Sequence, residues 1–430
     1  MGFIFKYIII MKKINKYLTT ELFTADKGRL DEYNYFIALT KDDNKIHLKK
    51  EKQQEEYKFT IKISKSETDP SKMITVEGSD PEVLLSQFKR CLCKKVSDNN
   101  VKICYLHDHN SNRYHEGTPA NTNGTEGDVM VYFPEMWYLG TDTDNEWVMN
   151  ISTVEQEGWK HAPASLVGAY KAKLQGIRLD KMHSISGADS DVNISMADFS
   201  LYARNRGAGY HLIDYQQHCI IAWMFYARYK NTNSQTICGT GKNTDAGVNC
   251  GVTNNLGMND TTAKTASGTS DMLVNFLGLE GCWGYKYEWI EGIHTHDTDG
   301  VIAYDKGDYH DQPFSSVQSS TKRILRTSSE GNLYDYISKI KGGEYMDMLP
   351  SEASGAANTH FSDFCNMKLG SMLVFGRSNN YANFNCGVTS LNGNYSSSNR
   401  YLYFSSRLAF DGNIEVVDDV NTFKSLPLNN

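Results

Sequence analysis

Asn, Ser and Tyr dominate a 29-residue segment near the C-terminus, from Ser378 to Ser406, which contains seven Asn, seven Ser and four Tyr. Arg400 is the only charged residue of this segment, and the segment contains no Lys, Glu, Gln, Met or Trp. Tyrosine offers rigid contact area at a low entropy cost, while Asn and Ser offer adaptable hydrogen-bond donors and acceptors. Side chains of this kind favour the recognition of a ligand over the chemistry of an enzyme.

The predicted ligand contacts are the polar and aromatic members of this segment. Residues 400–408 alternate in a way that is typical of a strand with one packed face and one displayed face. The members expected to hold the fold are Val388, Leu391, Leu402 and Phe404. The predicted ligand contacts are Asn379, Tyr381, Asn383, Phe384, Asn385, Thr389, Asn392, Asn394, Tyr395, Arg400, Tyr401, Tyr403 and Ser405.

Two other polar clusters offer metal ligands, but their spacing is common by chance. His294 and His296 are two residues apart, as two ligands on one face of a strand would be, but a solvated loop is the commoner interpretation. Carboxylates near glycines offer oxygens to a structural calcium ion without the register of an EF-hand. These carboxylates are Asp297, Asp299, Asp305 and Asp308. Apart from this calcium alternative, we expect no metal and no cofactor.

The sequence also lacks the usual patterns of a catalytic site. The nine cysteines form no C-x-x-C pair, so we expect most of them to be reduced and buried. There is no G-x-S-x-G motif and no carboxylate pair at a catalytic spacing. Glu288 lies on the other face of an alternating aromatic run that we expect to be a core strand, and should pair with a basic residue or cap backbone amides. We predict that the chain is not an enzyme.

Composition narrows the class of protein further. The 430 residues are 40% apolar and 22% charged, as in soluble globular proteins. A net charge of −7 gives no positive field for nucleic acid. There is no run of about 18 apolar residues that would insert in a membrane. The first basic residues mostly follow the N-terminal apolar stretch, unlike a signal peptide, and Met11 is an alternative start to Met1.

The chain divides by composition into four parts. Residues 1–106 are charged and alternating and are predicted to form a small N-terminal attachment module. Residues 107–127 are rich in Asn, Thr and Gly, which indicates a boundary loop. Residues 128–415 are expected to form one ligand-binding domain, and residues 416–430 a C-terminal tail.

Two helices are predicted inside the large domain by their capping residues. Ser195 precedes one helix that should end near Asn205, and Asp214 precedes another that should end near Tyr229. Short antiparallel strands are expected around them, including residues 58–66 before the domain and 127–139 and 147–152 within it, and a short helix over 81–90. We therefore predict an α+β fold that is rich in loops.

Several motifs together resemble the C-type-lectin-fold domains of phage tail proteins and related receptor-binding proteins. They are GDVMVYFPEMWY (127–138), GWKHAP (158–163), GAYKA (168–172), YKNTNSQTICGTG (229–241) and LGLEGCWGYKYEWIEGI (277–293). Residues 375–410 are similar to the variable region of proteins diversified by retroelements, a group that includes the phage major tropism determinants. The five missing residue types are those that Asn codons randomised at adenine cannot encode. The resemblance implies a C-type-lectin-like domain with a variable segment at 376–407.

The variable segment departs from the family pattern at both ends. The family opens it with Arg-Gly-Gly-Ser and closes it with Gly-Phe-Arg, whereas this chain has Gly376-Arg377-Ser378 and Ser405-Ser406-Arg407. The fold group also includes formylglycine-generating enzymes, whose Gly-Asn-Val-Trp-Glu-Trp motif is similar to residues 284–289. Those enzymes need two reactive cysteines late in the chain, and Cys386 has no partner at close spacing. A formylglycine-generating-type oxidase is therefore the less favoured alternative.

The resemblance implies a receptor-binding protein of a phage tail or virion, made in the bacterial cytoplasm. Its variable segment would recognise a protein or glycan on the host cell surface, and its N-terminal module would contact other tail or virion proteins. Tail proteins are often homotrimers, in which several weak sites act together. The alternative is a bacterial ligand-binding or adhesin protein of the same fold. Neither nucleic acid nor membrane insertion is expected.

Overall fold

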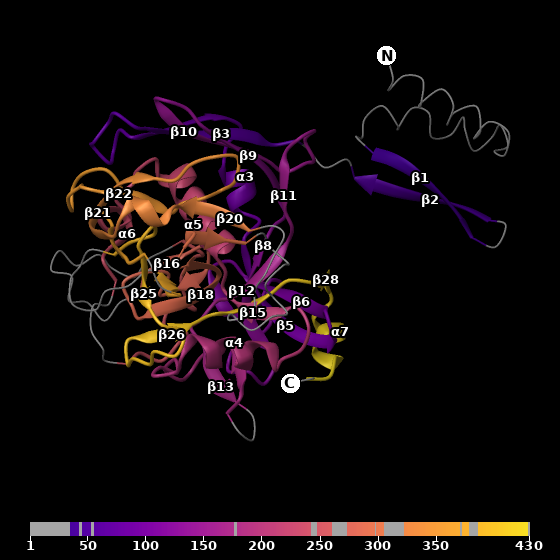
Figure 1. Cartoon of the computed structure of the whole chain (residues 1–430). Coiled ribbons are helices and arrows are strands. Elements are labelled where there is room, and N and C mark those ends of the chain that lie inside the picture. Colours follow the sequence, from indigo (N-terminus) through magenta and orange to yellow (C-terminus); the bar gives the residue numbers. More distant parts are fainter. Residues whose placement is uncertain are drawn as a thin grey trace, which may run out of the picture. The chain divides into compact units, whose positions relative to one another are not determined.

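The computed structural model describes residues 35–42, 45–52, 56–175, 179–241, 247–259, 273–296, 298–304, 322–369, 372–377 and 386–428. The chain separates into two compact units, Met1–Glu56 and Tyr57–Asn430. In the first unit, β1 (Tyr35–Asp42) and β2 (Lys45–Lys52) form an antiparallel hairpin (Figure 1). All other described elements belong to the second unit.

Five antiparallel strands form one sheet of the second unit. Two of them were predicted, at residues 58–66 and 147–152, and they lie side by side. Alternation along the first of these strands buries Phe59, Ile61 and Ile63. The order across the sheet is β11 (Lys160–Ala162), β9 (Met136–Asp142), β10 (Glu146–Ser152), β3 (Lys58–Ser64) and β4 (Ile74–Gly78).

An eight-stranded sheet joins strands from both ends of the second unit. The single strand predicted at 127–139 is in fact two strands in two sheets, β8 here and β9 above. Pro134 lies between them, and a proline has no amide hydrogen for a sheet ladder. The order is β15 (Tyr210–Leu212), β27 (Leu408–Phe410), β12 (Ser165–Gly168), β8 (Asp128–Phe133), β5 (Lys89–Ser97), β6 (Asn100–His107) and β28 (Asn413–Val416), with β7 (Asn110–Tyr114) also on β6.

A nine-stranded sheet carries both ends of the segment 378–406. Its strand β18 pairs antiparallel with β24, which precedes the segment, and parallel with β26, which closes it. The order is β20 (Arg323–Arg326), β19 (Gly300–Ala303), β18 (Tyr287–His296), β24 (Val374–Arg377), β25 (Leu391–Tyr395), β23 (Phe364–Met367), β21 (Leu333–Ile340) and β22 (Pro350–Ala353), with β26 (Phe404–Ser406) also on β18.

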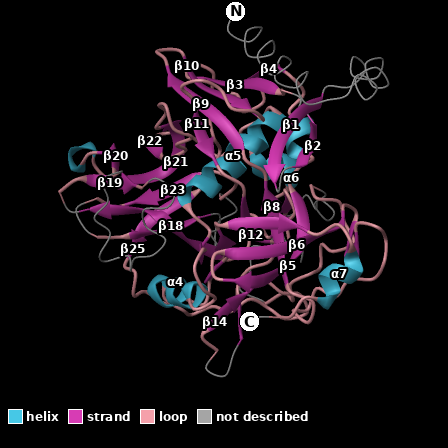
Figure 2. Ribbon diagram, turned by 90° about the vertical axis from the view of Figure 1, so that its right-hand side faces the viewer, coloured by secondary structure: helices cyan, strands magenta, loops and turns pink. Residues whose placement is uncertain are grey.

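The two predicted helices are confirmed with their caps. The Ser195 hydroxyl accepts a hydrogen bond from the Asp198 amide at the start of α4 (Met196–Arg204). Asp214 and Gln217 form a capping box at the start of α5 (Tyr215–Tyr229), which packs against β18 and β3 (Figure 2). The remaining elements are α3 (Glu82–Leu85), α6 (Ser234–Cys238), η2 (Ser328–Glu330), α7 (Val420–Ser425) and the strand pairs β13 (Lys173–Gln175) with β14 (Lys181–His183) and β16 (Asn275–Phe276) with β17 (Leu279–Glu280).

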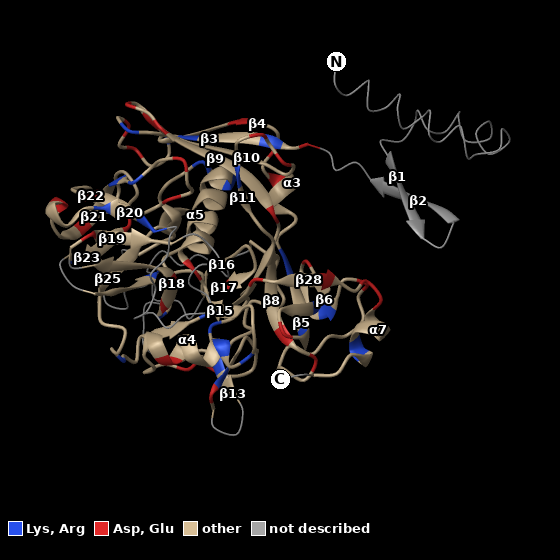
Figure 3. Ribbon diagram, turned by 45° about the vertical axis from the view of Figure 1, so that its right-hand side comes forward, with Lys and Arg blue, Asp and Glu red and all other residues tan. Residues whose placement is uncertain are grey.

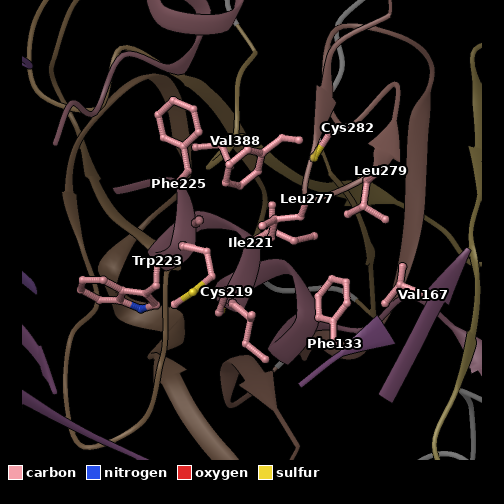
Figure 4. Close-up of a cluster of buried hydrophobic side chains, with 14 of the residues drawn as sticks. Phe133, Val167, Cys219, Ile221, Trp223, Phe225, Leu277, Leu279, Cys282 and Val388 are labelled. Carbon is pink, nitrogen blue, oxygen red and sulfur yellow. The ribbon is translucent and has the colours of Figure 1, made fainter. Parts of the chain in front are cut away.

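The core of the second unit surrounds α5. This helix is buried on nearly all sides, so its apolar residues contact both neighbouring strands and distant loops. The helix predicted over 81–90 is shorter, because Lys89 already belongs to β5. Figure 4 shows side chains of α5 facing residues of β8, β12, the β16–β17 region and the segment 378–406, namely Cys219, Ile221, Trp223, Phe225, Phe133, Val167, Leu277, Leu279, Cys282 and Val388.

The predicted α+β class is wrong, because the protein is mostly β. Among the residues that the structure describes, strands hold about 40% and helices about 13%. The short segments between glycine-rich and asparagine-rich turns lack helical periodicity, and they form strands instead. Lys and Arg are interspersed with Asp and Glu over these strands (Figure 3). In the part of the chain that the structure describes, no helix is long and apolar enough to cross a membrane.

The two units divide at a different place from the predicted N-terminal attachment module. The division follows Glu56, whereas the sequence placed a boundary loop at 107–127. Residues 57–106 belong to the second unit because their strands pair with later ones. The strand β3 pairs with β10, and β5 pairs with β8. The C-terminal residues 413–416 also join this unit, as β28 on β6.

Candidate functional site

A buried carboxylate, Glu288 on β18, holds both ends of the segment 378–406. Arg377, the last residue of β24, donates from Nη1 to Glu288 Oε2 at 2.6 Å. Arg407, the residue after β26, donates from Nε to Glu288 Oε1 at 2.7 Å. All three side chains are fully buried. The predicted pairing of Glu288 with a basic residue is confirmed, and the pairing closes the base of the segment. We call these three residues the Glu288 clamp.

Further contacts fix the charged side chains of the clamp. Lys171 donates a third ionic hydrogen bond to the same carboxylate. Arg407 also donates to the Ala169 carbonyl at 2.9 Å, and Arg377 donates from Nε to His218 Nδ1 at 3.1 Å. A buried guanidinium is tolerated only where its donors are paired in this way. The segment therefore starts and ends at positions that the interior determines.

The same contacts shift the pKa values of the charged groups. Burial alone would raise the pKa of Glu288, but the three surrounding cations overcome it and hold this pKa well below its usual range. Burial lowers the pKa of Lys171 to about 7, with the two guanidinium groups adding to this effect and Glu288 opposing it. Glu288 therefore stays ionised at neutral pH, and its charge holds the clamp together.

A second buried carboxylate, Asp363, holds the residues at which the described part of the segment begins. Its Oδ1 accepts from the Gly387 amide at 2.7 Å, and its Oδ2 accepts from the Thr389 amide at 2.8 Å and the Thr389 hydroxyl at 2.7 Å. Burial raises the pKa of Asp363 to about 6, and the hydrogen bonds it accepts oppose that rise. Thr389, a predicted ligand contact, is thus part of the interior.

Aromatic rings form the floor under the end of the segment. Phe404 of β26 stacks on Trp289 of β18, with ring centroids 3.8 Å apart and planes at 18°. Its ring also stacks on Tyr287, at 4.6 Å and 16°. Trp289 and Phe404 are fully buried, which confirms the core role predicted for both. Stacked rings of this size make a rigid support for side chains above them.

Three tyrosines lie on this floor, and we call them the tyrosine cluster: Tyr395, Tyr401 and Tyr403. Tyr401 and Tyr403 stack with centroids 5.0 Å apart and planes at 14°. Tyr395 meets Tyr401 edge-on at 5.6 Å. Each of the three is half-buried, with one part of the ring packed and another open to solvent. This is the arrangement of an aromatic contact surface with little conformational freedom to lose on binding.

The structure separates the predicted contacts into surface and interior positions. Arg400 is exposed, and it pairs with Asp198 of α4 at 2.6 Å. Asn394 is half-buried beside the tyrosine cluster. By contrast, Thr389, Asn392 and Ser405 are buried, and Asn392 donates from Nδ2 to the Tyr287 hydroxyl at 2.9 Å. Five predicted contacts lie outside the described residues: Asn379, Tyr381, Asn383, Phe384 and Asn385.

The alternation predicted for residues 400–408 fails at several positions, among them one predicted core residue and one predicted ligand contact. Leu402, predicted in the core, is 65% exposed. Leu402 and Tyr403 form a turn, so the strand begins only at Phe404. Ser405, predicted to face the ligand, is fully buried because both faces of this short strand are covered. The other predicted core members, Val388 and Leu391, are buried as expected.

Neighbouring strands add aromatic residues that the sequence analysis did not select. Tyr334 on β21 is 73% exposed, and its ring lies 5.1 Å from that of Phe364 on β23. Tyr336, two residues along β21, also contacts Phe364 edge-on, at 5.7 Å. In register, Tyr334 lies opposite Asn366, which lies opposite Asn392 of β25. In the sequence, the alternation of tyrosines in Leu333-Tyr-Asp-Tyr336 is the feature that would have predicted this additional aromatic surface.

The cysteines and histidines that the sequence offered as candidates do not form a catalytic arrangement among the described residues. All nine cysteines are buried, and burial raises the pKa of Cys386, which favours the neutral thiol over a reactive thiolate. His294 and His296 are part of β18, not a loop as predicted. Burial lowers the pKa of His294 to about 4. The possible calcium ligands Asp297, Asp305 and Asp308 lie outside the described residues.

Comparisons with known proteins find distant structural likeness without similarity in sequence. No family model matches the chain, and no curated protein sequence matches it. Among solved structures, the Major Tropism Determinant U1 variant is similar over 75% of this chain and 72% of that chain. The TM-score is 0.27 and the sequence identity is 10%. A likeness at this level assigns neither the fold nor the activity of this chain.

Proposed function

We propose that this chain is a ligand-binding protein that uses the tyrosine cluster and the adjoining polar residues to recognise a molecule on a cell surface. The observation that carries the proposal is the tyrosine cluster itself. Three half-exposed tyrosines rest on a stack of buried rings. The Glu288 clamp holds the segment that bears them at both ends. Residues that contact a ligand can be substituted without disturbing the fold where the side chains that they pack against are rigidly held.

The proposed contact surface of the protein extends beyond the C-terminal segment 378–406. Tyr334, Tyr336 and Phe364 lie on strands that follow β25 in the same sheet. Burial raises the pKa of the Tyr287 hydroxyl well above its usual range, and nearby Tyr395, Tyr403 and Tyr334 add to the rise. The two groups of tyrosines therefore approach one another around Tyr287. A ligand that covers the tyrosine cluster would also reach the exposed ring on β21.

We propose that the protein is part of a phage tail or is associated with the virion in another position. The Asn-, Ser- and Tyr-rich composition of residues 378–406 supports diversification of this segment by a retroelement. In this proposal, Met1–Glu56 supplies contacts to other virion proteins, and trimerisation raises avidity by about 10²–10⁴ over a single site. The second candidate is a bacterial adhesin with the same contact surface, which the same composition and geometry would also suit.

The experiment is cell binding by the fluorescently labelled full-length chain, measured by flow cytometry on a panel of bacterial strains. The variant is Tyr401→Ala/Tyr403→Ala, which removes the paired rings of the tyrosine cluster. The matched control is Tyr105→Ala on β6, because Tyr105 is also a half-buried tyrosine in contact with another one, Tyr132. Thermal unfolding of each variant shows whether it is folded.

We expect wild type to bind at least one strain, and the double variant to lose at least about tenfold in apparent affinity, as for removal of aromatic anchors worth 1–2 kcal/mol each. The Tyr105→Ala control should bind as wild type does. Equal binding by the double variant and wild type would overturn the assignment of the surface. An absence of binding to every strain, to a glycan array and to purified surface proteins would overturn the function.

A further inference from the structure

Three side chains with metal-ligating atoms meet at one edge of the eight-stranded sheet, away from the tyrosine cluster. His211 lies in β15, Asp214 caps α5, and Asp411 follows β27 directly. The pairing of β15 with β27 brings His211 and Asp411 together from distant parts of the sequence. One ligand atom from each of the three residues lies within 4.8 Å of the other two.

The hydrogen bonding of His211 directs its second ring nitrogen at a carboxylate. Its Nδ1 lies 2.6 Å from the Leu212 carbonyl oxygen, which can only accept a hydrogen bond, so Nδ1 carries the proton. The other ring nitrogen, Nε2, lies 3.3 Å from Asp411 Oδ2, and either a proton or a metal ion can join these two atoms. A histidine that ligates a metal commonly donates its other N–H to a backbone carbonyl in this way.

Asp214 adds a buried oxygen that its capping role does not use. Its Oδ1 accepts from the Gln217 amide at 2.7 Å, which completes the cap of α5. Its Oδ2 has no hydrogen-bond partner among the residues that the structure describes, although Asp214 is fully buried. An unpaired carboxylate oxygen in the interior costs free energy unless a cation or donor satisfies it.

Nearby groups leave negative charge at this place. Glu291 of β18 lies next to His211, since its Oε2 accepts from the Leu212 amide at 3.2 Å. Arg204 of α4 pairs with Glu291 Oε1 at 3.2 Å and so balances that one carboxylate. Asp214 and Asp411 bring two further carboxylates to the imidazole of His211, so a divalent cation at this place would meet oxygen ligands that carry negative charge.

We propose that His211, Asp214 and Asp411 bind one divalent transition-metal ion, with Zn²⁺ as the ion that fits best. Imidazole nitrogen and carboxylate oxygen are both ligands that Zn²⁺ accepts, and a set of three protein ligands leaves a fourth position open. Ligands about 2.0–2.2 Å from a tetrahedral zinc ion lie about 3.3–3.5 Å apart. The separation of 3.3 Å between His211 Nε2 and Asp411 Oδ2 matches that spacing.

The site lies on the wall of a cavity in the second unit, which makes it reachable by an ion and by a further ligand. This cavity has a volume of about 810 Å³ and is lined by Asp411 and by residues flanking the other two ligands, Gly209, Tyr215 and Gln216. Gln216 Oε1 is a further buried acceptor that lacks a hydrogen-bond partner within the described ranges. The open position of the metal would therefore face a space that can hold water or an oxygen ligand.

The experiment uses the full-length chain after removal of metal with a chelator, in the presence of a non-thiol reductant. Zn²⁺ binding is measured by isothermal titration calorimetry, and Co²⁺ is then bound for absorption spectroscopy. The variants are Asp214→Asn, which retains a good helix cap, and Asp411→Asn. The control is Asp347→Asn, since Asp347 lines the same cavity but pairs with Arg323 outside the cluster.

We expect one equivalent of Zn²⁺ to bind wild type and the control. Each variant at the cluster should bind at least about tenfold more weakly, because even the outer-shell partners of metal ligands contribute about 10–100-fold to affinity. The Co²⁺ form should show visible bands without thiolate charge transfer, which excludes binding to cysteine. The proposal is overturned if wild type binds no stoichiometric Zn²⁺, as a protonated His211–Asp411 ion pair would predict. Undiminished binding by the folded Asp411→Asn variant would overturn it as well.

Discussion

At the scale of single residues, two buried carboxylates hold the recognition segment, Glu288 at its two ends and Asp363 at a turn within it. Glu288 gathers two arginines that flank the segment, and Asp363 fixes the turn that contains Gly387 and Thr389. Neither carboxylate is exposed. A buried ion pair contributes little net stability compared with a well-packed apolar pair, but the removal of one partner is costly. The role of both groups is therefore to specify a conformation.

The first residue-scale prediction concerns Glu288→Gln. This change leaves Arg377, Arg407 and Lys171 buried without their counter-charge, so the free energy of unfolding should fall by about 3–5 kcal/mol. The measurement is urea denaturation at neutral pH. As a control, Glu352→Gln should change stability little, because Glu352 and its partner Lys339 are about half exposed. A loss in Glu288→Gln no larger than in this control would contradict the clamp.

The second residue-scale prediction concerns pH. The pKa of Asp363 is about 6 in the folded protein against an ordinary value of 3.8, so the folded state binds this proton more tightly than the unfolded state. The stabilisation from this group is complete below the lower value and is lost as the pH rises through the higher one, by up to about 3 kcal/mol. Asp363→Asn should remove this pH dependence.

Wild type and Asp363→Asn are compared by denaturant unfolding at several pH values between about 4 and 7, the window in which protonation of Asp363 changes the free energy of unfolding. The free energy of unfolding of wild type, minus that of Asp363→Asn, should decrease as the pH rises across this window. Other titrating groups act on both proteins alike and cancel in the difference. A constant difference would show that the pKa of Asp363 is not raised by folding.

At the scale of elements, close packing between strands makes the floor of the recognition surface. Gly376 of β24 lies against the ring of Phe404, and a Cβ atom added there would lie 2.5 Å from Phe404 Cε1 and 3.4 Å from Tyr287 Cδ1. The glycine is thus required for the approach of β26, not for an unusual backbone angle. The stack of Phe404 on Trp289 depends on this absence of a side chain.

The element-scale prediction is that Gly376→Ala destabilises the second unit by about 1–3 kcal/mol through overpacking. Near-ultraviolet circular dichroism should also change, because the aromatic stack must shift. Phe404→Leu removes the ring atoms that clash, so the double variant should lose less stability than the sum of the two single variants. Strict additivity in this double-mutant cycle would show that Gly376 and Phe404 do not compete for the same space.

At the scale of the whole molecule, the compact unit starts at Tyr57 and not near residue 128. The strands β3, β5 and β6 come from residues 58–107, and they are inner strands of two sheets. Without them, β8 and β10 would each lose a neighbour, and apolar residues on both sheets would meet water. The segment that the sequence assigned to an attachment module is part of the scaffold.

The whole-molecule prediction compares two shortened chains. Residues 57–430 should fold and unfold cooperatively, with a thermal midpoint within a few degrees of the full-length chain, roughly the effect of less than 1 kcal/mol. Residues 128–430 should fail to fold, because they lack central strands and their core partners. Circular dichroism and thermal scans of purified protein distinguish the two. A cooperative transition in 128–430 would restore the boundary that the sequence suggested.

Local features of this protein were predictable from the sequence because neighbouring residues produce them. The caps Ser195 and Asp214 act within one helical turn, and alternation along residues 58–64 reflects the side-chain period of a single strand. The composition of residues 378–406 likewise indicates contact chemistry without reference to the fold. These signals identified both main helices, several strands and the tyrosine cluster.

Only the tertiary structure decided which residues of the segment are buried and which are exposed. Ser405 and Thr389 are buried, and Leu402 is exposed, because strand pairing and buried carboxylates far away in the sequence set their environment. The predominance of strands, the grouping of Glu288 with two distant arginines, and the meeting of His211 with Asp411 have the same cause. Periodicity reports the local conformation of a chain, whereas burial and charge pairing depend on contacts between segments that the sequence does not place together.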